Sequence, residues 1–208
     1  MIVLSHRGYW LEPAERNQRV AFERSFRLGF GTETDLRDAN GKIVISHDVP
    51  VGEVQNFSEF LTHYRAHAVG NLPLALNIKA DGLAAIVKQD LAEFPELDVF
   101  AFDMAVPDMR AYIECGIPVF TRMSEVEQQP SWLEQSAGIW LDSFGPTWFE
   151  AGLVADLLAT GKRVCVVSSE LHRREPEPLW EMLTEYSSAD NLLLCTDMPV
   201  QAQAFFKI

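Results

Sequence analysis

Residues 31–48 read GTETDLRDANGKIVISHD, a stretch in which two extended runs flank the dipeptide Asn40-Gly41. Asn-Gly tolerates the positive φ angles of a two-residue reversal between strands. The spacing therefore predicts that the chain turns back on itself between the extended runs at residues 32–36 and 43–46, as an antiparallel hairpin. This hairpin decides the fold, because its second strand does not count as one of the strands of the larger parallel sheet.

Outward from the hairpin, short apolar runs alternate with amphipathic stretches along the whole chain. The other strands are expected at residues 2–5, 74–79, 99–102, 117–121, 138–141, 163–167 and 191–195. Most of these runs are continuously apolar, which is typical of parallel strands buried on both faces. Helices are expected at residues 18–28, 58–66, 83–94, 107–115, 147–160 and 178–186.

Repeated alternation of strand and helix indicates an α/β fold, either an open doubly wound sheet or a (β/α)₈ TIM barrel. No glycine-rich dinucleotide fingerprint follows the first strand, which counts against a nucleotide-binding open sheet. Without the hairpin strand, eight of the nine candidates remain for a barrel. We therefore predict one (β/α)₈ domain over residues 1–208. Because 208 residues is near the short end for this fold, some helices should be short or missing.

Composition limits the partners. The chain has 30 acidic and 17 basic residues, a net charge of −13 that repels nucleic-acid backbones and anionic bilayers. We expect no nucleic-acid partner and no membrane insertion, since no apolar run approaches the roughly 20 residues of a membrane-spanning helix. Three cysteines fit no zinc spacing, and no secretory leader is visible, so a cytoplasmic protein is expected. The sequence does not indicate an oligomeric state.

Residues with catalytic chemistry gather in the first quarter of the chain. His6 and Arg7 follow the first apolar run, Glu33 and Asp35 share one strand face, and the hairpin returns His47 toward them. Two imidazoles can accept and donate protons near neutral pH. Two adjacent carboxylates repel each other unless a proton or a cation such as Mg²⁺ or Ca²⁺ intervenes, and Arg7 can hold a phosphate oxygen. This combination suits phosphodiester cleavage.

These residues also carry a family resemblance. His6-Arg7-Gly8, Glu33-x-Asp35 and His47-Asp48 resemble the motif set of the glycerophosphodiester phosphodiesterases, (β/α)₈ enzymes related to phosphatidylinositol-specific phospholipase C. The similarity resumes at residues 77–79, Asn-Ile-Lys, and at residues 195–199, Cys-Thr-Asp-Met-Pro. Between residues 80 and 192 only the alternation of strand and helix matches.

The resemblance implies a small-molecule phosphodiester as substrate and one divalent cation, Mg²⁺ or Ca²⁺, as cofactor. It implies attack on phosphorus by a neighbouring substrate hydroxyl, through a cyclic phosphate that water then opens. The roles that it implies are acid and base for His6 and His47, metal ligands for Glu33, Asp35 and Asn77, and phosphate contacts for Arg7 and Lys79.

Two positions depart from the family pattern. Asn77 stands where the family has a glutamate ligand, so it can offer a metal only a neutral carbonyl oxygen. Weaker metal binding is expected, unless Asp81 or Asp103 supplies the missing acid. Arg16 also replaces a family glutamate, which predicts either added positive charge beside the substrate or an ordinary surface position.

Two other functions fit the same residues. The barrel can be a non-catalytic phosphate- or sugar-phosphate-binding protein that has lost a metal ligand at Asn77, or an α/β enzyme in which Glu33 and Asp35 are structural. Other polar residues follow expected strands and are either site residues or helix caps: Asp103, Arg122, Asp142 and Glu170. His172, next to Arg173 and Arg174, is expected in a solvated loop.

Overall fold

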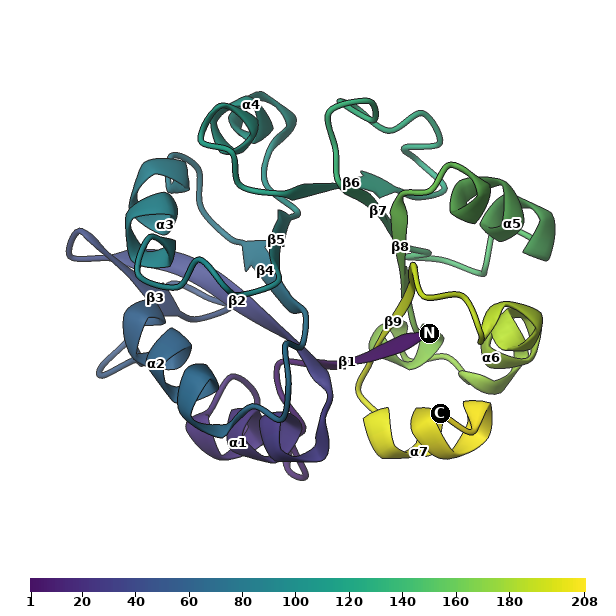
Figure 1. Cartoon of the computed structure of the whole chain (residues 1–208), viewed down its shortest axis with the longest axis horizontal. Helices are drawn as coiled ribbons and strands as arrows, with labels where there is room; N and C mark the ends of the chain where they lie inside the picture. The colour runs from purple at the N-terminus through teal and green to yellow at the C-terminus, as the bar shows by residue number, and fades with distance from the viewer.

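The computed structural model describes all 208 residues and is a closed barrel with helices around it (Figure 1). β1 pairs with β2 on one side and with β9 on the other, so the parallel sheet has no free edge there. The (β/α)₈ prediction is confirmed. The barrel strands are β1 Ile2–His6, β2 Gly31–Ala39, β4 Leu74–Ile78, β5 Val99–Phe102, β6 Val119–Met123, β7 Gly138–Leu141, β8 Arg163–Val167 and β9 Leu192–Thr196.

The hairpin lies outside this ring. Strand β3 (Lys42–Ile45) runs antiparallel to the end of β2, with Ala39 opposite Lys42. Asn40 and Gly41 adopt φ angles of 52° and 75°, as a two-residue reversal requires. The predicted hairpin is confirmed, and it carries the chain back to the carboxyl end of the barrel.

Helices cover the outside of the barrel, except between β6 and β7, where the connection contains none. This confirms the expectation that helices are missing from so short a chain. The helices are α1 Arg19–Leu28, α2 Phe57–His67, α3 Ala84–Leu91, α4 Val106–Glu114, α5 Ala151–Ala159, α6 Glu177–Leu183 and α7 Pro199–Phe206, with short 3₁₀ turns at η1 Pro13–Glu15, η2 Ser169–His172 and η3 Thr184–Tyr186.

Several element boundaries differ from the prediction, and one helix was not predicted. Helix α5 begins at Ala151 rather than at residue 147, and the loop before it is pinned by a 2.7 Å hydrogen bond from Trp148 Nε1 to Asp142 O. Strand β6 begins only after Pro118, which has no N–H to donate to a ladder. Helix α7 was not predicted, although Pro199 stands at its first position, where proline is favoured.

The barrel interior is filled by side chains. Phe100 stacks on Phe120, and Phe102 stacks on Trp140, each with ring centroids 3.7 Å apart. The interior cluster is Leu4, Ala75, Phe100, Phe102, Phe120, Trp140, Cys165, Val167, Leu193 and Cys195. The interior is therefore a packed core and not a pore.

Side-chain alternation decides what stands on top of this core. Inward-facing residues recur every second position along a strand. Continuing from the interior cluster toward the carboxyl ends of the strands, the next inward positions are polar: His6 on β1, Glu33 and Asp35 on β2, Asn77 on β4, Asp142 after β7 and Asp197 after β9. The sequence thus places its polar residues at the end of the barrel where such folds form their sites.

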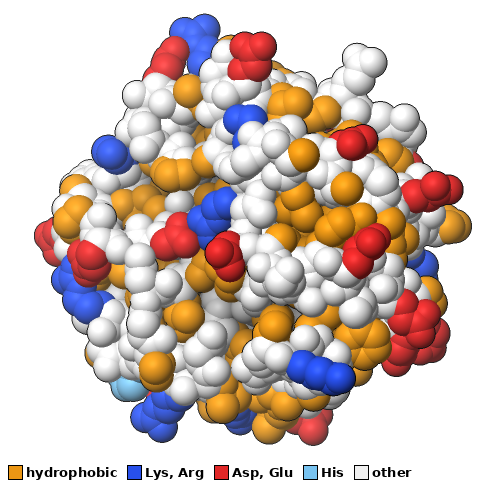
Figure 2. All heavy atoms as spheres, turned by 45° about the vertical axis from the view of Figure 1, so that its right-hand side comes forward, with side chains coloured by type: hydrophobic (Ala, Val, Ile, Leu, Met, Phe, Trp, Pro, Cys, Tyr) orange, Lys and Arg blue, Asp and Glu red, His pale blue; other side chains and the backbone are white.

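The surface carries mixed charge. Figure 2 shows acidic and basic side chains interspersed over one face, without a continuous basic patch on that face. None of the helices is both long and apolar enough to cross a bilayer.

Candidate active site

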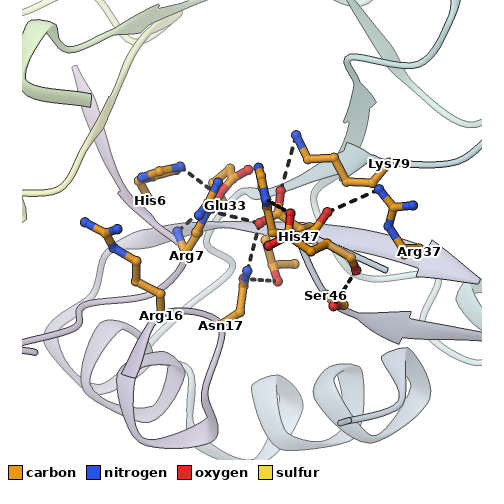
Figure 3. Close-up of polar contacts among 12 residues, drawn as sticks. His6, Arg7, Arg16, Asn17, Glu33, Arg37, Ser46, His47 and Lys79 are labelled. Atoms are coloured by element: carbon orange, nitrogen blue, oxygen red, sulfur yellow. Dashed lines mark hydrogen bonds and ion pairs between the residues drawn. The ribbon is translucent and has the colours of Figure 1, made fainter. Parts of the chain in front are cut away.

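His6 is held by a carboxylate that comes from the opposite end of the chain. Its Nδ1 lies 2.8 Å from Asp197 Oδ1, and Trp10 Nε1 donates to the same oxygen at 3.2 Å. A carboxylate only accepts, so His6 Nδ1 donates to Asp197 and Nε2 is the ring nitrogen left to exchange a proton. Nε2 points toward Glu33, 3.9 Å from Oε2 (Figure 3).

The loop after β1 is tightly constrained. Arg7 and Gly8 both have positive φ, 57° and 80°. A Cβ on Gly8 would lie 2.8 Å from the backbone carbon of Ala21, so only glycine fits there. This bend aims the Arg7 amide at Glu33 Oε2, 3.1 Å away.

Asp35 lies at the centre of a buried ion-pair network. Arg7 Nε is 3.0 Å from Oδ2 and Lys79 Nζ is 3.4 Å from Oδ1. Asn17 donates to Oδ2 at 2.7 Å and accepts from Thr34 at 3.0 Å, which fixes its amide orientation. The two cations predicted to bind phosphate are therefore brought together and share one carboxylate (Figure 3).

Glu33 is fully buried between these groups. Burial, and after it the negative charge of Asp35, raises the pKa of Glu33 above its ordinary value, while the charges of His6, Arg7 and Lys79 oppose that rise. A cation near Glu33 would stabilise its ionised form.

Among the predicted metal ligands, three buried oxygens make no hydrogen bond: Glu33 Oε1, Asn77 Oδ1 and Asp35 Oδ1, the last of which has only the ion pair with Lys79. Asp35 and Asn77 are direct neighbours across the β2–β4 ladder. All-oxygen donors of this kind fit a hard divalent cation. The set holds only two carboxylates, however, and nowhere in the chain are three or more His, Cys, Asp or Glu side chains arranged to hold a metal ion. The residues therefore fit such a cation with fewer anionic ligands than a dedicated site provides.

The remaining predicted residues line a cavity of about 260 Å³ at the barrel mouth. His6, Arg7, Glu33, His47, Asn77 and Lys79 all contribute to its wall. His47 lies at its edge, with 44% of its side chain exposed and Nδ1 3.0 Å from Asp48. Asp35 lies beneath Arg7 and Lys79, outside the lining. The structure thus brings the two histidines to one cavity.

Three other acids were expected near the site: Asp81 and Asp103 as substitutes for the missing metal ligand, and Glu170 as a residue that follows a strand. Asp81 is exposed and does not line the cavity. Asp103 does line it, but its carboxylate is 2.7 Å from Arg122 and 3.8 Å from Lys79. Glu170 accepts from Thr196 at 2.5 Å and from the Asp197 amide at 3.0 Å, so it braces the end of β9 rather than the cavity.

Arg16 is neither a free surface residue nor a cavity residue. Its guanidinium lies over the Trp10 ring, 4.1 Å from the centroid, and 3.8 Å from Asp197 Oδ2. It therefore adds positive charge behind the carboxylate that holds His6.

The sequence analysis assigned no function to two residues that the structure places at the site, Asp197 and His172. Asp197 was named only as part of a matching motif. Its position directly after the last strand could have indicated a place at the site. His172 was expected in a solvated loop, yet it lines the cavity with Nε2 2.8 Å from Asp142 Oδ1. No local pattern could indicate that contact, because the two residues are 30 positions apart.

No family model matches the chain, and no curated protein matches it by sequence. Solved structures do match its fold over almost its whole length. A glycerophosphodiester phosphodiesterase from Agrobacterium tumefaciens is 15% identical, with a TM-score of 0.70 and full coverage of both chains. One from Parabacteroides distasonis is 16% identical, with a TM-score of 0.55, covering 99% of this chain and 96% of that one.

A third match is a Ca²⁺-dependent phosphatidylinositol-specific phospholipase C from Streptomyces antibioticus. It is 10% identical, with a TM-score of 0.57, covering 99% of this chain and 95% of that one. At such identities the likeness establishes the fold alone. The chain therefore shares its barrel with the family that its motifs resemble, and its activity has to be argued from its own residues.

Proposed function

We propose that this protein is a phosphodiester hydrolase acting on small glycerophosphodiester-type substrates, as a divergent relative of the glycerophosphodiester phosphodiesterases. The observation that carries the proposal is the His6–Asp197 pair, 2.8 Å apart, which leaves Nε2 available for proton transfer beside a cavity lined by two cations. The fold shared with phosphodiesterases and the matching motifs support it.

The substrate phosphate binds through Arg7 and Lys79, which reach the cavity from β1 and β4. Their pairing with Asp35 holds both side chains at one place before the substrate arrives. His6 and His47 transfer the protons of the reaction, whether the attacking oxygen is a neighbouring substrate hydroxyl or water. A divalent cation held by Glu33, Asp35 and Asn77 would polarise a phosphoryl oxygen.

One specific observation favours a second candidate, a non-catalytic phosphate-binding barrel. Asp35 is already neutralised by two cations, and Asn77 supplies no charge, so the site can receive an anion without a metal. The two functions differ in one measurement, because a binding protein retains phosphate esters without turning them over.

Removing either histidine tests the proposal. We expect His6→Ala to lower kcat by about 10²–10⁴-fold, the range of general acid–base catalysis, and His47→Ala to lower it less because His47 is half exposed. Hydrolysis of a panel of glycerophosphodiesters and bis(p-nitrophenyl) phosphate, with Mg²⁺, Ca²⁺ or chelator, measures both.

His67→Ala, on the outer helix α2, is the matched control and should keep the wild-type rate. Wild-type turnover that survives both His6→Ala and His47→Ala would refute the proposed mechanism. A wild-type protein that binds the diesters without cleaving them would favour the binding barrel.

A further inference from the structure

The wall of the same cavity on the β7–β8 side carries a second histidine–carboxylate pair. His172, in η2 after β8, places Nε2 2.8 Å from Oδ1 of Asp142, the residue that follows β7. Asp142 is only 6% exposed, and the same oxygen accepts the Ser143 amide at 2.7 Å. Asp142 is therefore a fixed acceptor that orients the imidazole.

The pair leaves one ring nitrogen available. Since the carboxylate only accepts, His172 Nε2 carries a proton and donates it to Asp142. Nδ1 makes no hydrogen bond within the protein, and His172 lines the same cavity as His6 and His47. His6 shows the same arrangement with its nitrogens exchanged, because there Nδ1 binds the carboxylate.

The cavity has two chemically different halves. Arg7 and Lys79 provide the positive charge on the β1–β4 side, whereas Trp140, Phe144 and Leu171 form an apolar wall on the β7–β8 side. A phosphodiester whose phosphate binds the cations must place its second alcohol in the other half. His172 is the histidine that lines that side.

We propose that His172 is a further catalytic residue, which protonates the oxygen of the leaving alcohol, and that Asp142 positions it. This inference rests on the proposed function. It assigns His6 to the attacking oxygen, and it assigns the half-exposed His47 to proton exchange with solvent.

The step balances in protons and electrons. The attacking oxygen forms a bond to phosphorus and gives its proton to His6 Nε2. The bond from phosphorus to the second alcohol breaks, its electron pair stays on the leaving oxygen, and that oxygen takes the proton of His172 Nδ1. Exchange with solvent then returns His6 to its neutral form and His172 to its protonated form.

The charges around His172 suit this role. The hydrogen bond that His172 donates to Asp142 raises the pKa of His172 above its ordinary value; burial and the charge of Arg174 oppose the rise, and Glu125 adds to it. The protonated acid therefore persists to a higher pH than a free imidazole would allow. Asp142→Asn removes the main cause, so the basic limb of the pH–kcat profile should move to lower pH.

Two substrates that differ only in the leaving group test the assignment. Both are glycerol phosphodiesters, with ethanol or p-nitrophenol as the second alcohol. Ethoxide needs a proton to leave, whereas p-nitrophenolate does not. We expect His172→Gln to lower kcat at least about 100-fold for the ethyl ester and only a few-fold for the p-nitrophenyl ester.

His67→Gln is the matched control, and it should leave both rates unchanged. Thermal unfolding of each variant shows whether it is folded, and Asp142→Asn gives a second measurement if His172→Gln is not. Equal losses on the two esters, no loss on the ethyl ester, or an unmoved basic limb in Asp142→Asn would overturn the inference. A wild-type protein inactive on both esters would instead refute the proposed function itself.

Discussion

Among single residues, Asn77 has the largest effect on the chemistry of the site. It lies directly opposite Asp35 in the β2–β4 ladder, and its Oδ1 makes no hydrogen bond. A glutamate at this position would add a third anion beside Glu33 and Asp35. The asparagine instead leaves two carboxylates facing two cations, Arg7 and Lys79, so the charges already balance without a metal ion.

Asn77→Glu should strengthen metal binding. In chelator, the extra buried carboxylate should lower the Tm, because like charges repel in a buried site. With saturating Mg²⁺ or Ca²⁺, affinity about tenfold above wild type, or about 1.4 kcal/mol, should make the ion-induced rise in Tm roughly 3–6 °C larger than the rise in wild type. Thermal unfolding across an ion titration measures this.

Asn77→Gln lengthens the side chain without adding charge, and it is the control. If Asn77→Glu responds to the ions no more than Asn77→Gln does, position 77 is not a metal ligand.

At the scale of elements, the β1–α1 connection is the most demanding segment. Arg7, Gly8 and Asn17 all have positive φ, and the Asn17 amide donates to Arg7 O at 3.0 Å, which closes the loop on itself. The same loop places the Arg7 side chain against Asp35 and the Arg7 amide against Glu33. Its backbone strain is located where the phosphate is expected to bind.

Gly8→Ala should therefore destabilise the protein and impair it. The positive φ and the contact with Ala21 together should lower the free energy of unfolding by about 1–3 kcal/mol, and displacement of Arg7 should lower kcat/KM. Urea unfolding and diester hydrolysis check the two effects.

The control is Gly29→Ala at the end of α1. Gly29 has a φ of 78°, close to the 80° of Gly8, but nothing lies within 4 Å of its added Cβ. Gly29→Ala should therefore lose stability only through the unfavourable positive φ, and it should keep its activity. If the two variants lose equal stability and both stay active, the close contact between Gly8 and Ala21 does not matter for activity.

For the molecule as a whole, barrel closure assembles the site. His6 on β1 meets Asp197 after β9 only because these two strands pair in parallel. Packing of the interior in turn supports that closure. Gly138 is the most tightly enclosed glycine of the chain, since an added Cβ would lie 2.5 Å from Phe120 Cζ and 2.6 Å from Arg163 O.

Gly138→Ala should accordingly cost about 3 kcal/mol in the free energy of unfolding, because the stacked aromatic rings and the strand backbone leave no room. Gly152→Ala, in helix α5 with nothing within 4 Å of its Cβ, should instead stabilise the protein by about 0.5–1 kcal/mol. Urea unfolding of both variants gives the comparison. Similar small effects in the two would mean that the barrel interior relaxes freely around Gly138.

The sequence by itself determined the strands, the hairpin and the fold class, because side-chain alternation, Asn40-Gly41 and continuous apolar runs are local signals. It also indicated that His6, Glu33 and His47 share one end of the molecule, since parallel strands place their carboxyl ends together and the hairpin returns His47 to that end. Helix boundaries such as that of α5 escaped it, because the contacts that hold the preceding loop, such as the hydrogen bond from Trp148 Nε1 to Asp142 O, leave no pattern in the sequence.

Only the tertiary structure decided which carboxylates orient the histidines. Asp197 is 191 positions from His6, and Asp142 is 30 positions from His172, so neither pair leaves a pattern in local sequence. Closure of the barrel brings each pair within hydrogen-bond distance, and the resulting contacts set which ring nitrogen faces the cavity. Residue types are local properties of a chain, whereas the protonation that gives them a chemical role depends on neighbours supplied by the fold.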